Sequence, residues 1–125
     1  MNPRFLMNSV VGLVLLAAAA AGCGGSVDSR PAKWSYIAPI IIEPNCATAN
    51  CHSALTQRKM VQLDKIDLSF KAAKMWAGFV PNLRSISSAF PRMPPDAPLP
   101  EPDIALIEAW FQGGAQWDGP GPEPK

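Results

Sequence analysis

The chain has 125 residues, 11 of them basic and 10 acidic, with three cysteines and a single histidine. This length fits one domain with a modest core. The balanced charge, with no basic stripe, excludes nucleic acid as an expected partner.

Residues 1–22 have the pattern of an export signal. Arg4 supplies the positive charge, residues 10–21 are apolar, and residues 20–22 are the small residues that a signal peptidase requires. This apolar run is shorter than the about 20 residues that span a bilayer. We therefore expect a cleaved signal and not a membrane helix. Its removal takes Arg4 away and leaves 10 basic and 10 acidic residues.

Cys23 stands directly after these small residues, and in this it resembles the lipidated cysteine of bacterial lipoproteins. The alternative is a cysteine that stays free or is removed. With lipid attached, residues 23–33 form a polar tether between a membrane and the folded domain. We expect an exported, periplasmic protein held by a lipid anchor. In that compartment cysteines form disulfides or attach a cofactor.

The first half of the domain predicts two helices. Residues 34–42 are apolar enough for a first helix, or for an extended lead-in because Pro39 interrupts them. Residues 68–79 predict an amphipathic helix that ends at Gly78 and Pro81.

Proline dominates the second half, since ten of the 14 prolines lie at or after residue 81. Residues 90–102 hold the densest run and predict a loop with polyproline character. Residues 101–111 predict the last helix, which has acidic residues in its first turn and is stopped by two glycines. We expect an all-α domain over residues 34–118 and a loose tail over residues 119–125.

The segment NCATANCH, residues 45–52, contains the only histidine. In the usual signature for covalent haem, Cys-x-x-Cys-His, both thiols add to the haem vinyl groups and the imidazole ligates the iron. Here four residues separate Cys46 from Cys51, and His52 still follows the second cysteine directly. That adjacency brings an axial ligand next to one attachment point, and the longer insert still lets Cys46 reach the other vinyl group.

Three other interpretations of this segment stay open. A Cys46–Cys51 disulfide closes a very short loop, adds little stability and leaves His52 unexplained. Zinc has three candidate ligands here, but neighbouring Cys51 and His52 chelate one ion awkwardly. Copper takes cysteine, histidine and methionine ligands, although the spacing matches no copper loop.

The order of motifs resembles that of single-haem cytochrome c domains in exported bacterial proteins. The similarity covers most of residues 36–119 and is carried by IAPIIIEPNC, the CH pair, LDKIDLS, RMPP and IALIEAWFQGGAQWDG. It implies a small all-α fold with proline-rich loops around one covalent haem c. It also implies that Cys46 and Cys51 form the thioethers, and that His52 and Met93 ligate the iron. The four-residue insert departs from the common form.

The residues themselves also favour Met93. A six-coordinate iron needs a ligand besides the single histidine, and three methionines follow the signal. Met75 lies on a predicted apolar stripe, where we expect core packing, and Met60 has no supporting motif. Met93 lies among prolines that restrict the backbone, although a gap-filling role in a surface loop is the alternative. Arg92 is a candidate partner for a haem propionate, or else a solvated side chain.

The aromatic residues have two interpretations. They either form walls for the haem or pack on one another; the candidates are Trp76, Phe79, Trp110 and Phe111. A large apolar cofactor would complete a thin core.

We therefore expect an electron carrier and not an enzyme, because the sequence offers no nucleophile or base in a recognisable set. Its partners would be redox proteins of the cell envelope. Two alternatives stay open. One is a haem-free exported lipoprotein with a disulfide and an interaction role. The other is a haem sensor for a small gas, which requires that the iron readily loses Met93.

Overall fold

The computed structural model describes residues 28–125. The expected signal, Cys23 and residues 24–27 of the expected tether lie outside these residues. Within residues 28–125, all regular secondary structure is helical, which confirms the all-α prediction. None of the helices in this part is long and apolar enough to cross a membrane.

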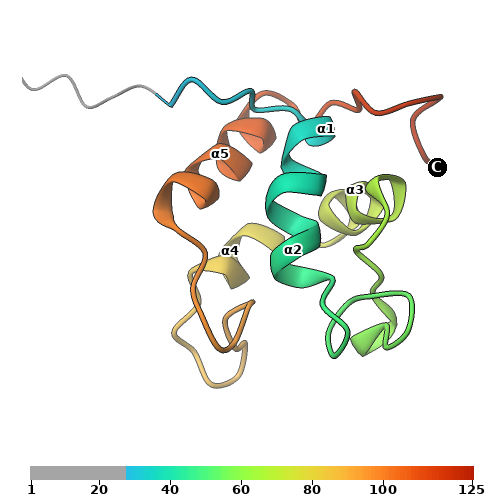
Figure 1. Ribbon diagram of the computed structural model, residues 1–125. Helices are drawn as coiled ribbons and strands as arrows, with labels where there is room; N and C mark the ends of the chain where they lie inside the picture. Colours follow the sequence, from blue (N-terminus) through green and yellow to red (C-terminus); the bar gives the residue numbers. More distant parts are fainter. Residues whose placement is uncertain (1–27) are drawn as a thin grey trace, which may run out of the picture.

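A continuous helical segment forms the centre of the molecule (Figure 1). It consists of α1 (Trp34–Ile37), a π-helix (Ala38–Ile42) and α2 (Glu43–Cys46). Pro39 has no N–H to donate, and the chain accommodates it in the first turn of the wider π segment. The predicted helix is therefore confirmed, and it continues as far as the first cysteine of the CH motif.

Two short helices replace the single helix that was predicted over residues 68–79. They are α3 (Ile66–Met75) and α4 (Phe79–Leu83), and between them Trp76 has an extended backbone. The predicted end at Gly78 and Pro81 was wrong, because the helix stops at Met75 and Pro81 lies inside α4. A proline fits there because its missing N–H lies in the first turn, where no partner is required.

The predicted proline-rich loop and last helix are confirmed. The chain from residue 84 to residue 100 has no helix, and α5 spans Glu101–Gln112. Arg84, directly after α4, forms ion pairs with Glu101 and Glu108 of α5. These pairs close the base of the loop by linking its two flanking helices.

The core is aromatic and lies where α3 and α5 pack on α1. The rings of Trp34 and Trp110 have centroids 4.4 Å apart, and Phe70 meets both edge-on. The indole N–H of Trp34 lies 3.2 Å from the carbonyl oxygen of Ile66 and 3.3 Å from Ser69 Oγ. The fully buried large side chains are those of Trp34, Phe70, Ile37, Ile41, Ile42 and Ile107.

The residues after α5 fold back over this core. Trp117 packs on Phe70 with ring centroids 4.9 Å apart, and its indole N–H donates to the carbonyl of Gly121 at 3.0 Å. Lys74 of α3 pairs with Glu123 at 3.2 Å. The segment expected to be a loose tail, residues 119–125, thus contacts Trp117 and α3.

Candidate cofactor site

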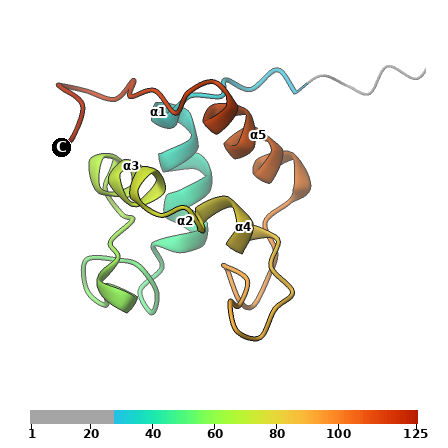
Figure 2. The same ribbon diagram turned by 180° about the vertical axis from the view of Figure 1, so that it is seen from behind.

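A cavity of about 690 Å³ lies at the loop end of the molecule. Two loops contribute to its lining (Figures 1 and 2). One is residues 47–65, which include the short 3₁₀ helix η2 (Arg58–Met60), and the other is residues 84–100. Its volume falls within the range of about 300 to 1,000 Å³ that is usual for small-molecule and cofactor sites. Most of its lining is apolar: Val61, Leu63, Leu68, Ala72, Trp76, Phe79, Leu83, Pro94, Pro95 and three methionines.

The structure brings all four predicted haem-binding residues to this one cavity. Cys46 lines it from the end of α2, Cys51 and His52 line it from the first loop, and Met93 lines it from the second. Cys46 is the last residue of α2, and its carbonyl accepts the backbone N–H of His52 at 3.0 Å. This bond folds the four-residue insert into a compact turn. Both cysteines and the histidine therefore reach the same wall despite the long spacing.

A backbone carbonyl holds the His52 ring. Its Nδ1 lies 3.3 Å from the carbonyl oxygen of Val61. A carbonyl only accepts hydrogen bonds, so in the neutral imidazole this contact selects the tautomer with the proton on Nδ1, which leaves the Nε2 lone pair for a metal. The backbone of His52 is fixed as well, because its carbonyl accepts the N–H of Leu63 at 2.7 Å. Such outer contacts orient histidines that bind metals.

Both thiols at the site are free and partly buried. The pKa of Cys46 is raised to about 12, first by burial and then by the proximity of Cys51. Cys46 therefore stays protonated at neutral pH, as a neutral thiol at an apolar wall. The disulfide of the haem-free alternative is not formed in this structure.

The three methionines all line the cavity but come from different sides. Met60 immediately precedes Val61, the residue whose carbonyl holds the His52 ring. Met75 ends α3 and is 81% exposed, so the expectation that it packs in the core was wrong. Met75 is the last residue of α3, whereas the buried residues of this helix, Ser69, Phe70 and Ala73, come before it. Met93 is the one methionine on the loop opposite His52, and its N–H donates to the carbonyl of Asn82 at 3.0 Å.

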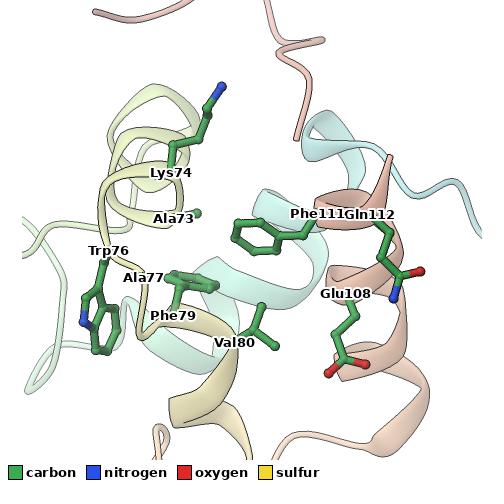
Figure 3. A pocket seen from close by; sticks show the side chains of 9 residues that line it. All are labelled: Ala73, Lys74, Trp76, Ala77, Phe79, Val80, Glu108, Phe111 and Gln112. Atoms are coloured by element: carbon green, nitrogen blue, oxygen red, sulfur yellow. The ribbon is translucent and has the colours of Figure 1, made fainter. Parts of the chain in front are cut away.

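The aromatic candidates divide between the cavity and the core. Trp76 and Phe79 line the cavity, whereas Trp110 is buried against Trp34. Trp76 and Phe79 also border a second hollow of about 430 Å³ between α3, α4 and α5 (Figure 3). Phe111 belongs to that second hollow. The rings of Trp76 and Phe79, with centroids 6.1 Å apart, therefore border both the cavity and the second hollow.

Arg92 does not line the cavity. Its Nε donates to the carbonyl of Pro94 at 3.3 Å, and its Nη2 donates to that of Pro95 at 3.4 Å. The charged side chains in the lining are instead Arg58 and Lys59, two neighbours that sequence reasoning did not single out. Asn82 was missed too, because a backbone acceptor leaves no signature in a sequence.

The donor set suits a haem better than a metal held by protein alone. In residues 28–125 no three side chains among histidine, cysteine, aspartate and glutamate come close enough to hold an ion. A haem needs only one or two protein ligands for its iron, together with two thiols and apolar walls. The cavity offers each of these.

No family model matches the chain, and the searches of curated proteins and of solved structures gave no match either. Inference about its function therefore rests on the site.

Proposed function

We propose that this protein is a small cytochrome c-like electron carrier with one covalently attached haem c. One observation carries the proposal: His52 and Met93 lie on opposing loops of a single apolar cavity, and both free cysteines lie beside His52. Cys46 and Cys51 would form the thioethers, while His52 and Met93 would ligate the iron.

When bound, the haem supplies an iron centre that gains and loses one electron. The residues of the chain set the conditions. His52 presents Nε2 because the Val61 carbonyl holds Nδ1–H. The Met93 thioether favours the reduced state and raises the reduction potential. The apolar lining would limit the access of water to the bound haem. Partners would be redox proteins of the cell envelope.

The proposal is tested first on the protein expressed with export and haem-maturation machinery. A haem stain should survive a denaturing gel, since thioethers do not dissociate. His52→Ala should lose the spectrum of a six-coordinate haem. A purified protein with no haem, in which Cys46 and Cys51 form a disulfide, would establish the interaction lipoprotein instead.

The distal ligand is tested by Met93→Ala. We expect the loss of the sulfur-to-iron absorption band of the oxidised protein, a lower reduction potential, and new binding of carbon monoxide to the reduced form. Met60 and Met75 line the same cavity, so Met60→Ala and Met75→Ala serve as controls. Both variants should keep the sulfur-to-iron absorption band. Loss of the band in either control but not in Met93→Ala would reassign the ligand. If the wild type already binds carbon monoxide readily, the gas sensor replaces the electron carrier.

We also propose export and lipid anchoring through Cys23, on the sequence pattern alone. The wild type should fractionate with membranes, and Cys23→Ser should be soluble in the periplasm or retained with its signal uncut. The spectrum of the folded domain should not change, because residues 24–33 are expected to be tether. Identical fractionation of the two proteins would reject lipidation.

A further inference from the structure

We infer that Arg92 is a positioning residue, which holds the loop around Met93 in the shape that ligation requires. This role rests on the proposed function and replaces the propionate contact considered from the sequence. The geometry points to it because the Arg92 guanidinium donates to the carbonyls of Pro94 and Pro95, the two residues that follow Met93.

The loop needs such a brace because its backbone is tied to the helices at few points. Within residues 85–99, one backbone N–H donates to another backbone group, that of Met93 to Asn82 at 3.0 Å. Prolines at 91, 94, 95 and 98 have no N–H. A loop with few internal bonds opens at low free-energy cost. The ion pairs of Arg84 fix the base of the loop but do not reach its tip.

Arg92 compensates for this at the tip. Two of its guanidinium nitrogens donate to the carbonyls of Pro94 and Pro95, which follow Met93 in the chain. The Asn82 carbonyl holds Met93 from the helix side. The planar fork of a guanidinium suits two acceptors at once, whereas a lysine ammonium is a point charge on a flexible stem. The brace therefore depends on the shape of arginine and not only on its charge.

Competition with an added ligand measures how strongly the hydrogen bonds of Arg92 keep the loop around Met93 closed. Imidazole binds ferric iron only when Met93 has left, so its apparent affinity rises as the fraction of closed loop falls. We expect Arg92→Gln and Arg92→Lys to raise imidazole affinity about 3- to 10-fold, in keeping with two long, partly exposed bonds to a charged donor. Met93→Ala, which removes the competing thioether, sets the upper limit of the imidazole affinity. Arg30→Gln is the same change at an arginine outside both the cavity and the loop, where Arg30 pairs with Asp28 and Asp103, and it should match the wild type.

A second measurement does not involve the iron. Hydrogen exchange at the Met93 amide, which donates to the carbonyl of Asn82, should be faster in both Arg92 variants and unchanged in Arg30→Gln. Wild-type imidazole affinity and exchange in Arg92→Gln would overturn the inference, and so would full rescue by lysine, since that result assigns Arg92 a charge role. Absence of haem, or equal imidazole affinity in Met93→Ala and the wild type, would reject the proposed function itself.

Discussion

The helical end and the loop end of this molecule differ in how far their apolar side chains are buried. At the helical end Trp34, Phe70 and Trp110 are almost fully buried and pack on one another. At the loop end Met60 is 93% exposed, Met75 81% and Trp76 46%, and all three line the cavity.

Apolar side chains therefore pack on one another at the helical end, whereas at the loop end they stay exposed around a cavity. Apolar surface left in water forgoes about 25 cal/mol for each Å² that burial would remove. A cavity that gathers such surface, together with two thiols and an imidazole, is what an apolar cofactor would fill. The core and the cavity share Leu63, Phe79 and Leu83, so the packed end supports one wall of the site.

The largest effect is expected where the cofactor would be attached. Cys51→Ala should abolish covalent haem, because Cys51 is adjacent to the His52 ligand. Cys46→Ala should leave a weakened, singly attached species, because the longer insert separates this thiol from His52. A haem stain and the mass of the intact protein distinguish the two. Equal, wild-type haem content in both variants would exclude covalent attachment through these residues.

The core prediction tests whether the helical end is self-sufficient. Phe70→Ala should lower the free energy of unfolding by about 3 to 5 kcal/mol, the usual range for a buried phenylalanine. The reason is that Phe70 contacts Trp34, Trp110 and Trp117. Denaturant unfolding monitored by circular dichroism measures the change. A cost below about 1 kcal/mol would show that this cluster does not hold the fold together.

Met75 on the same helix provides the matched contrast. Because its side chain is mostly exposed, Met75→Ala should cost under about 1 kcal/mol in the same unfolding experiment. A cost as large as that of Phe70→Ala would instead place Met75 in a packed core, as the sequence pattern suggested.

The sequence predicted which segments are helical better than it predicted where each helix begins and ends. Residues 34–42 and 101–111 were found as helices because their apolar spacing and flanking signals agree. The break after Met75 was missed because no proline or glycine occurs there. The chain turns at Trp76, whose extended backbone leads into α4. That turn is a tertiary effect, since it brings Phe79 into both the core and the cavity wall.

The candidate site was predictable where adjacency carries the chemistry. Cys51 and His52 are neighbours in the chain, so their joint role is visible in the sequence. The bracing of Met93 was not visible, because the Asn82 carbonyl and the Pro94 and Pro95 carbonyls are backbone groups. The charges of Arg58 and Lys59 were also missed, since only the folded loop places them at the cavity.

The smallest predicted effect concerns the loop on the histidine side. The carboxylate of Asp64 accepts the backbone N–H of Ala54 at 2.8 Å and the amide N–H of Gln62 at 2.6 Å. These bonds, that from Ala54 first, hold the pKa of Asp64 below its ordinary value of 3.8. Since the folded pKa is the lower one, this stabilisation is present above pH 3.8 and is lost as the pH falls through the folded pKa.

Asp64→Asn should therefore weaken the fall in Tm that the wild type shows as the pH drops below 3.8, and the two proteins should converge once the pH is below the folded pKa of Asp64. Asp67→Asn is the matched control, because Asp67 is exposed in the first turn of α3 and its side chain makes no hydrogen bond within residues 28–125. Thermal unfolding across this pH range measures all three proteins. If Asp64→Asn and the wild type lose Tm in parallel, the carboxylate does not hold the loop, and the wall that carries His52 must be fixed by backbone bonds alone.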